Sequence, residues 1–478
     1  MNFFSDSAME WIALASIVYF FIVNTIYLLL LMASVWALSD QVKKKPVLNY
    51  LNQNDSAFAP SISILAPAYN EQETVVDSIK SFLMLEYPSF EIIAINDGST
   101  DETLQRLINN FGLEKINPIY DGSLSETEVR GAYQSKIHPQ LKVIDKKNGG
   151  KADALNVGIG FSRYDIFCAV DSDSLLEKDA LSKVAAPFLD RSTEVVASGG
   201  TVRIANGSRI KFGRVDQVKL PKNLLALMQV IEYTRAFLCG RIGWNVFNST
   251  LVISGAFGLF SKKAVKAVGG YTPRCIGEDM ELVIRLHQYH RFHQIPYSIV
   301  FVPDPVCWTE APSDLASLGK QRDRWQRGLA DTLVRSRKMF LNPRYGFIGL
   351  VALPYFLIVE LLGPLIEVLA VSLILISLVF GQLDSKLLFE FFVVSILYGT
   401  ILSIGSLIIE EVFFSKYNKV RQFGTLFLMG IFESIWYRPL TTFWRLRGLY
   451  KYVRGDHTWG QINRTGFKKD RSQNSDAA

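Results

Sequence analysis

The sequence has little of what marks several common protein classes. It has four cysteines in 478 residues and no CxxC pair, which excludes a disulfide framework and a cysteine-ligated zinc site and suits a reducing compartment. Its 17 prolines, with an apolar content of 49%, exclude collagen-like and disordered chains. The net charge is only +6, with no basic block of the kind that binds nucleic acid, so we expect no nucleic-acid partner.

The composition averages two kinds of segment. A mean hydropathy of +0.18 is high for a soluble enzyme, whereas 20% charged residues is too much for a chain lying wholly in lipid. Residues 11–38 carry no charge over 28 positions, more than the roughly 20 needed to cross a bilayer. Lys43, Lys44 and Lys45 follow directly. The positive-inside rule then predicts an outside N-terminus, with residue 43 onward in the cytosol.

The segment from about 60 to 310 has a different pattern. Short apolar runs that end in Asn, Asp or Gly alternate with helix-period stretches; they are SISILAPAY, FEIIAINDG, LKVIDKKN and YDIFCAVDSD. This alternation predicts βαβ units and a mostly parallel sheet. Ligands of such sheets bind beyond the carboxyl ends of the strands, where the Asp-rich turns of this chain fall.

Apolar segments return from about 345, and the pair before residue 380 is interrupted by Pro354 and by Gly363-Pro364. The many cations of the C-terminal tail favour a cytosolic tail, hence four C-terminal spans and five in all. Predicted domains are 1–42, an N-terminal transmembrane helix; 43–340, a cytosolic domain with interfacial helices; 341–445, transmembrane helices; and 446–478, a cytosolic tail. Within the spans, Glu360, Glu367 and Glu433 either line a polar channel or make contacts inside the helix bundle.

Asp171 and Asp173 follow the run YDIFCAV. Two carboxylates one residue apart at a strand end can bind one oxygen-coordinated Mg²⁺ or Mn²⁺, which would neutralise a diphosphate leaving group. The alternative is a capping pair, because a helical stretch comes next.

Two neighbouring strand ends offer groups for a nucleotide. Asp97, in NDGSTD, could accept hydrogen bonds from a base or ribose; the alternative is an ordinary turn that caps the helix predicted at 102–110. Pro67, Tyr69 and Glu71 end the first strand, where an aromatic ring can stack on a base and a carboxylate can hold a sugar.

The run KNGGKAD follows another predicted strand. Its paired glycines can turn backbone N–H groups toward an anion, with Lys151 as countercharge and Asp153 two residues on. The spacing is not that of a Walker sequence.

Glu278 and Asp279 begin an amphipathic helical segment, MELVIRLHQYH. Such acids often only complement the helix dipole. Beside a bound sugar, however, a carboxylate here could act as the general base for an attacking hydroxyl.

Gln321, Arg324 and Trp325 lie in a basic predicted helix. Arg324 could clamp a phosphate, and the indole of Trp325 is a flat platform on which a sugar can stack. In the alternative reading, Arg322 and Arg327 of this helix face lipid headgroups.

These motifs, in this order, resemble the membrane-bound, processive branch of glycosyltransferase family 2, which includes cellulose, hyaluronan and poly-N-acetylglucosamine synthases. The resemblance runs through PAYNE, NDGSTD, GGKADALN, DSD, GED and QRDRW, over roughly 60–330. It implies a GT-A (Rossmann-like) α/β cytosolic domain plus an α-helical transmembrane region. It also implies a UDP-sugar donor and an inverting mechanism.

The resemblance assigns roles to the motif residues. Asp279 matches the catalytic base, Trp325 the acceptor platform, and Asp171 with Asp173 the nucleotide and metal site. The predicted nucleotide-sugar-binding residues are Pro67, Tyr69, Glu71, Asp97, Lys151, Asp153, Asp171, Gln321 and Arg324. The other predicted acceptor contacts are Ser254, Gly255 and Glu278, and the segment from Thr458 to Arg464 resembles a gating segment.

The predicted function is that of a hexosyltransferase of the plasma (inner) membrane, multi-pass, with its catalytic domain in the cytosol. It would use a UDP-sugar, with UDP-N-acetylglucosamine preferred, and Mg²⁺ or Mn²⁺ to extend and translocate a β-linked glycan. The short tail after the last apolar segment and the single N-terminal span disfavour a cellulose synthase. Partners would be the growing glycan or a lipid acceptor, the bilayer and an accessory membrane subunit. The alternatives are a non-processive enzyme that adds one sugar to a lipid and an inactive membrane scaffold.

Overall fold

The computed structural model describes residues 6–54, 59–172, 174–190, 192–211, 214–379, 385–414 and 420–456. The chain divides into two compact units, each described by itself below. A helical unit comprises Met1–Asp40, Leu227–Ser249 and Ser313–Ile462, and a sheet unit comprises Gln41–Ala226, Thr250–Pro312 and Asn463–Ala478. Residues 227–249 and 313–340 thus group with the apolar helices, whereas the sequence placed them in a cytosolic domain that includes interfacial helices.

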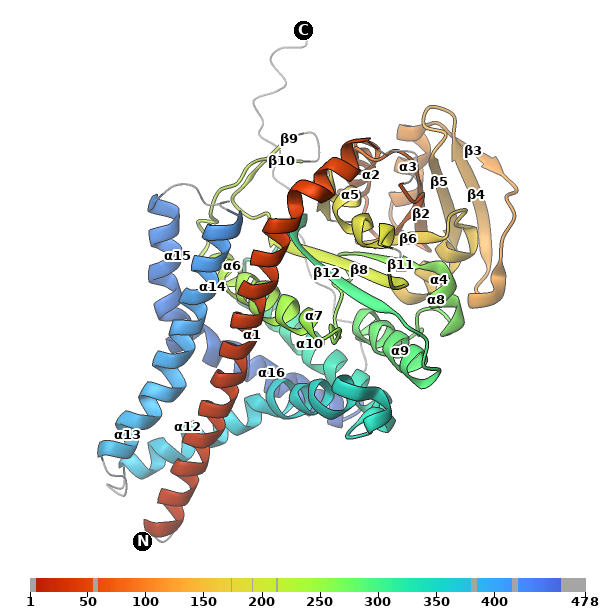
Figure 1. Cartoon of the computed structure of the whole chain (residues 1–478). Helices are drawn as coiled ribbons and strands as arrows, with labels where there is room; N and C mark the ends of the chain where they lie inside the picture. Colours follow the sequence, from red (N-terminus) through yellow and green to blue (C-terminus); the bar gives the residue numbers. More distant parts are fainter. Residues whose placement is uncertain are drawn as a thin grey trace. The chain divides into compact units, whose positions relative to one another are not determined.

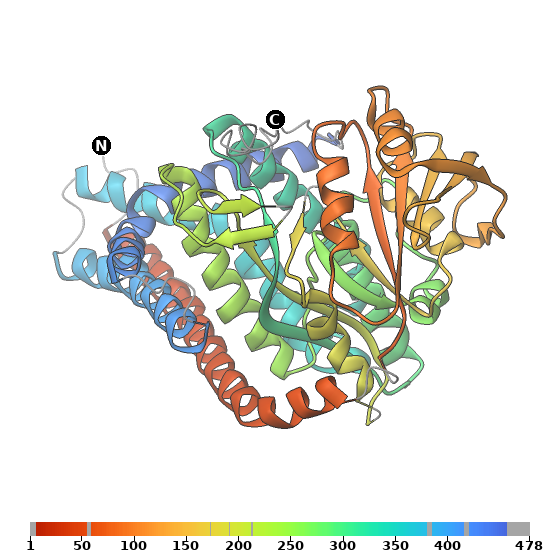
Figure 2. The ribbon, with the colours of Figure 1, turned by 90° about the horizontal axis from the view of Figure 1, so that it is seen from above.

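The sheet unit is built on one sheet of ten strands, flanked by helices (Figures 1 and 2). The strand order is β3-β4-β5-β2-β1-β6-β11-β8-β12-β7. The strands are β1 (Ile62–Ala68), β2 (Phe90–Asp97), β3 (Leu113–Ile116), β4 (Val129–Ser135), β5 (Leu141–Lys146), β6 (Ile166–Val170), β7 (Leu175–Leu176), β8 (Val195–Ile204), β11 (Phe257–Ser261) and β12 (Ser298–Thr309).

The four strands that the sequence predicted are neighbours in space. β5, β2, β1 and β6 are adjacent and parallel, so the predicted parallel sheet is confirmed for them. Ala68 pairs with Asn96 and Asp97 with Lys146, which brings three carboxyl ends to one edge of the sheet. The polar turns after these strands therefore lie together.

The other strands make the sheet mixed, which the sequence did not indicate. β11 is antiparallel to both β6 and β8, and β4 is antiparallel to β5. β12 pairs in parallel with β8. The helices of the sheet unit include α2 (Val75–Leu83), α3 (Thr103–Phe111), α4 (Lys151–Phe161), α5 (Ala180–Ala185), α8 (Lys262–Ala267) and α9 (Glu278–Phe292).

One apolar core fixes the strands that carry the site. α4 packs on β1 and β2, and its Leu155 is buried with Leu65, Ile93 and Ile144 of three adjacent strands. Phe167 of β6 is fully buried in the same core, where its ring lies 5.6 Å from that of Phe260.

The helical unit contains α1 (Asp6–Asn54) up to Asp40, η4 (Ala236–Arg241), α7 (Ile242–Val246), α10 (Leu315–Arg335), α12 (Gly363–Val379), α13 (Ser385–Phe392), α14 (Tyr398–Phe414), α15 (Val420–Phe432), η10 (Glu433–Tyr437) and α16 (Arg438–Val453), with most of α6 (Leu224–Arg235).

Among the described residues, two helical stretches are long and apolar enough to cross a membrane, Glu10–Gln41 and Ser385–Phe414. A third candidate is the pair Ile348–Leu361 and Gly363–Val379, bent by 45°. The bend falls at the predicted Gly363-Pro364 interruption, where proline cannot donate to the preceding turn. A count of five spans stays a prediction.

Apolar side chains cover the exposed surface of α1. Trp11, Phe21, Leu29, Met32 and Trp36 are each more than half exposed. Figures 1 and 2 show α1 beside α13 and α14, and Asn24 of α1 donates 2.7 Å to the carbonyl of Val394. A helix in lipid requires this arrangement, with apolar side chains facing outward and polar side chains bonded to neighbouring helices.

The acidic residues among these helices have partners within the helical unit. Glu433 is fully buried, 2.6 Å from Arg235, and accepts a 2.7 Å hydrogen bond from Ser403. Glu360 accepts from Tyr27 at 2.8 Å, and Glu367 accepts from Thr442 at 3.0 Å. The structure therefore supports the bundle-contact reading for Glu433, which has no exposed surface.

We expect Phe167→Ala to destabilise the sheet unit by about 3–5 kcal/mol, because it removes a buried ring and leaves a cavity. Thermal unfolding of the detergent-solubilised chain measures the effect. Ile119→Ala is the control, since Ile119 is 97% exposed and should change stability by less than about 0.5 kcal/mol. Equal midpoints for the two variants would contradict this account of the core.

Candidate active site

The turns after β1 and β2 are tied to each other by hydrogen bonds. The amide of Asn70 donates to Ser99 Oγ at 3.0 Å, and the amide of Thr100 donates to Asn70 Oδ1 at 2.9 Å. Asn70 adopts a φ of 54°, in the left-handed region that asparagine tolerates. Tyr69, the preceding residue, is 47% exposed at this edge of the sheet, where a ring could stack on a base.

Two acidic groups of these turns stabilise local structure. Asp101 Oδ1 accepts from the amide and the hydroxyl of Thr103, the first residue of α3, at 3.0 and 2.5 Å, one position before the N-cap residue Glu102. Glu71 Oε2 accepts a 2.7 Å hydrogen bond from Thr74. In the NDGSTD turn, Asp101 therefore supports the start of the helix, although the N-cap residue itself is Glu102.

Asp97 organises the turn after β5. Its two carboxylate oxygens accept from the amides of Gly149 and Gly150 at 3.0 and 2.8 Å, and Lys146 Nζ lies 2.5 Å from Oδ1. Asp97 is only 3% exposed. The paired glycines do hold an anion, as the sequence indicated, but the anion in this structure is the Asp97 carboxylate.

Lys146 is a buried cation that sequence reasoning missed. Its side chain has no exposed surface, and Nζ also lies 2.7 Å from Asp153, which accepts a 2.7 Å hydrogen bond from Ser125. Burial by itself raises the pKa of Asp153, but the hydrogen bonds from Lys146 and Ser125 outweigh it and hold that pKa below its usual value. The available signal in the sequence was a lysine inside the predicted strand run LKVIDKKN; its pairing with Asp97 appears only in the fold.

Close packing at this turn requires glycine. Gly98 has a φ of +66°, and a Cβ there would lie 2.6 Å from the backbone nitrogen of Asn148. A Cβ on Gly149 would lie 2.3 Å from the Asp153 carboxylate. The lack of a side chain at Gly98 lets the turns after β2 and β5 approach each other, and its lack at Gly149 leaves room for the Asp153 carboxylate.

Lys151, the first residue of α4, lies at the centre of a second charged cluster. Its Nζ is 2.5 Å from Asp171 Oδ1 and 3.8 Å from Glu278 Oε1, and it donates to the carbonyl of Gly255 at 3.2 Å. The amide of Gly255 in turn donates to Asp279 Oδ2 at 3.1 Å. Burial lowers the pKa of Lys151, but Asp171 and Glu278 outweigh it, so the ammonium stays charged.

This cluster joins residues that lie far apart in the sequence. Asp171 follows β6, Gly255 precedes β11, and Glu278 and Asp279 begin α9. The predicted residues Lys151, Asp171, Gly255, Glu278 and Asp279 are therefore brought together, while Asp97 and Asp153 meet at Lys146.

A divalent cation suits the oxygen donors at this edge. Asp171 presents a carboxylate that is 29% exposed, and hard oxygen ligands are what Mg²⁺ and Mn²⁺ prefer. The other predicted ligand, Asp173, lies outside the described residues, as does the segment from Thr458 to Arg464. Among the residues that are described, no three His, Cys, Asp or Glu side chains form a ready metal site.

Gln321, Arg324 and Trp325 belong to α10 of the helical unit. Their i, i+3 and i+4 spacing places them on one face of the helix, and Trp325 is 43% exposed. The lipid-headgroup reading of Arg322 and Arg327 is wrong: they are 2% and 4% exposed and form ion pairs with Glu232 and Asp323.

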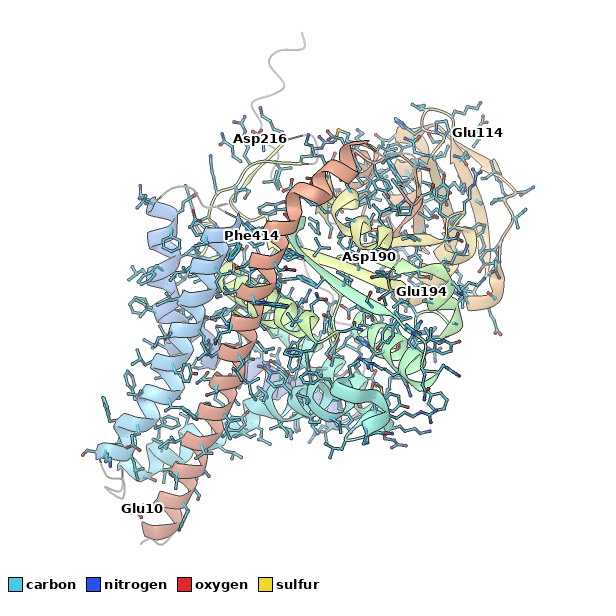
Figure 3. The ribbon with its side chains drawn as sticks, in the orientation of Figure 1. Glu10, Glu114, Asp190, Glu194, Asp216 and Phe414 are labelled. Carbon is cyan, nitrogen blue, oxygen red and sulfur yellow. The ribbon has the colours of Figure 1, made fainter. Side chains whose placement is uncertain are left out.

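We expect Lys146→Met to cost about 3–5 kcal/mol of unfolding free energy, because it leaves two buried carboxylates without their cation. Thermal unfolding of the full chain measures the loss. Lys136→Met is the matched control: Lys136 pairs with Glu114, on the edge strand β3 (Figure 3), and both side chains are well exposed, so the change should be below about 1 kcal/mol. A stability equal to that of the control would refute the role assigned to Lys146.

Comparison with known proteins places this site in a family. Residues 59–328 match the model of "Glycosyltransferase like family 2". A poly-β-1,6-N-acetyl-D-glucosamine synthase of Staphylococcus epidermidis is 31% identical over 296 residues, or 62% of this chain and 61% of that protein. The Staphylococcus aureus (strain COL) protein of the same name is 31% identical over 275 residues, or 57% of this chain and 56% of that one. The match therefore spans about three fifths of the length of these relatives.

Solved structures resemble the chain more distantly. A mannosyltransferase from Pyrobaculum calidifontis, solved with GDP-mannose and Mn²⁺, is 14% identical with a TM-score of 0.48 and covers 85% of this chain and 99% of its own. Glucosyl-3-phosphoglycerate synthase from Mycobacterium tuberculosis is 16% identical with a TM-score of 0.35 and covers 60% of this chain and 83% of its own.

The family match extends over more than half of the chain and includes every described strand of the large sheet. It confirms the predicted family, and the four parallel strands with polar turns at their carboxyl ends agree with the predicted GT-A fold. The chain belongs to glycosyltransferase family 2.

Proposed function

We propose that this chain is a membrane-embedded, inverting hexosyltransferase that uses UDP-N-acetylglucosamine to extend a β-1,6-linked glycan and translocates the product. The observation that supports this proposal most directly is the charged cluster at Lys151. Its ammonium lies beside Asp171 and Glu278 and donates to Gly255, whose amide donates to Asp279. Such a cluster supplies what glycosyl transfer needs at one place, a general base and charge that can meet a diphosphate. The choice of sugar and linkage follows the names of the relatives.

The proposed reaction is one displacement. An acceptor hydroxyl oxygen attacks C1 of the α-linked sugar, and its proton passes to the carboxylate of Asp279. The bond from C1 to the phosphate oxygen breaks, UDP leaves with that electron pair, and the anomeric centre is inverted. The amides of Gly255 and Met280 donate to Oδ2 and Oδ1 of Asp279 at 3.1 and 2.8 Å, which would hold the base in a fixed orientation.

The remaining assignments follow from the predicted roles. Tyr69 and Asp97, with Pro67 and Glu71, would bind the uridine side of the donor, and Ser254 and Glu278 would bind the acceptor. Lys151 and Asp153 belong to the donor side, where Lys151 could exchange its contact with Asp171 for the diphosphate. Gln321 and Arg324 would bind the pyrophosphate, and Trp325 would support the acceptor.

A divalent cation held by Asp171, with Asp173 as the other predicted ligand, would stabilise negative charge on the leaving diphosphate. The carboxylate chemistry of Asp171 fits Mg²⁺ or Mn²⁺. In this structure the same carboxylate pairs with the ammonium of Lys151.

The proposal places the chain in the inner membrane as a multi-pass protein, with the sheet unit in the cytosol, where UDP-sugars are available. The apolar helices Glu10–Gln41 and Ser385–Phe414 support membrane insertion. The cationic run Lys43, Lys44, Lys45 supports the orientation. We also propose an accessory membrane subunit as a partner of the chain.

We expect Asp279→Asn to lower UDP release from UDP-N-acetylglucosamine by about 10²–10⁴-fold, because it removes the proton acceptor. A coupled UDP assay on the purified chain measures the rate, and digestion by a β-1,6-specific glycosidase tests the product. Asp190→Asn is the control, because Asp190 is exposed at the end of the short helix η3 (Ala186–Leu189) (Figure 3). Wild-type rates in folded Asp279→Asn would exclude Asp279 as the base.

Chelation tests the metal. We expect excess EDTA to abolish UDP release and added Mg²⁺ or Mn²⁺ to restore it, because the leaving diphosphate would lose its countercharge. Mass spectrometry of the natively purified chain before and after EDTA gives a second readout of bound metal. Full activity after complete metal removal would rule out this part of the proposal.

A further inference from the structure

Two side chains of the helical unit lie against the indole ring of Trp325. Arg322, one turn earlier on α10, places its guanidinium carbon 4.2 Å from the centre of the indole ring. The ring of Tyr233, on α6, lies 6.3 Å from it at an angle of 45°. Residues on two elements of the helical unit therefore contact Trp325 while 43% of its surface stays exposed.

Arg322 is itself held in place. Its Nη2 donates to Glu232 Oε2 at 2.6 Å and to the hydroxyl of Tyr437 at 3.3 Å. The Tyr437 hydroxyl also donates to Glu232 Oε2 at 2.6 Å. Glu232 belongs to α6 and Tyr437 to η10, so two segments of the helical unit other than α10 hold one guanidinium.

The rest of this guanidinium has no hydrogen-bond partner. Arg322 is 2% exposed, and neither Nε nor Nη1 has one among the described residues. A buried polar group without a partner is costly. The indole face of Trp325 offsets part of that cost, because a planar cation is attracted to an aromatic ring.

Arg327, on the same helix, links segments through hydrogen bonds to oxygen atoms. Its Nε donates to Asp323 at 2.8 Å and its Nη1 donates to the carbonyl of Asp456 at 3.0 Å. It is nearly as buried as Arg322, with 4% of its surface exposed. Arg322 combines such burial with a position against the ring of Trp325.

We propose that Arg322 is a positioning residue that fixes the indole of Trp325, so that its exposed face is ready for the end of the acceptor glycan. This inference rests on the proposed function, in which Trp325 supports the acceptor. Arg322 acts through Trp325 and touches neither donor nor base. Losing it should weaken acceptor binding and shorten the product while leaving the KM for the UDP-sugar unchanged.

Binding of a soluble β-1,6-linked N-acetylglucosamine pentasaccharide to the full detergent-solubilised chain, measured by calorimetry, tests this. Arg322→Lys keeps the charge but lacks the planar group, so the Kd should rise about tenfold. Glu232→Gln, which weakens the hold on Arg322, should raise it in the same direction. Arg327→Lys is the matched control and should stay within about twofold of wild type.

A double-mutant cycle separates positioning from general damage. In the Trp325→Ala background, Arg322→Lys should add less than about twofold, because the platform on which it acts is gone. The inference is overturned if Arg322→Lys binds with wild-type affinity or loses no more affinity than Arg327→Lys. It is also overturned if the effects in the cycle are additive, or if the wild-type chain does not bind the pentasaccharide. If Arg322→Lys does not fold, Glu232→Gln and its own cycle with Trp325→Ala decide.

The binding measurement does not depend on turnover. A chain that binds the pentasaccharide in this pattern but releases no UDP would contradict the proposed function and leave the positioning role intact. If the chain releases UDP but Arg322→Lys binds the pentasaccharide as tightly as wild type, the positioning role is contradicted and the proposed function stands.

Discussion

The ammonium of Lys146 is the contact on which the sheet edge depends. It lies between the carboxylates of Asp97 and Asp153, at 2.5 and 2.7 Å, with no exposed surface. Buried carboxylates remain ionised only if a cation and hydrogen bonds compensate for lost hydration. With that compensation, Asp97 can bind the amides of Gly149 and Gly150, and the turn that leads to Lys151 takes its shape.

The second cluster differs from the first in exposure. Lys151 and Asp171 are partly exposed, at 22% and 29%, whereas Lys146 is fully enclosed. Ion pairs that reach solvent can exchange partners with a ligand, while enclosed pairs maintain geometry. One cluster therefore supports the turn, and the other presents charge at the edge where substrate would bind.

The helical unit uses the same chemistry among apolar helices. Arg235 with Glu433, and Arg322 with Glu232, are ion pairs between different elements of the unit. Charges surrounded by apolar side chains must be paired, so such contacts fix which faces of the helices meet. The pair at Arg322 also places a cation beneath an exposed tryptophan.

Period, turn residues and length are local properties, so the sequence alone predicted the parallel strands β1, β2, β5 and β6, the apolar helix after residue 10 and polar turns at the strand ends. It could not determine the antiparallel pairing of β11 or the grouping of 227–249 with the apolar helices, which depend on long-range packing. Asp97 illustrates the same limit. Its position in a turn was predicted from the sequence, but only the folded chain brings the amides of Gly149 and Gly150 to its carboxylate. Tertiary structure likewise decided that Lys146 is buried and that Arg322 lies against Trp325, because burial and pairing arise only when distant segments meet.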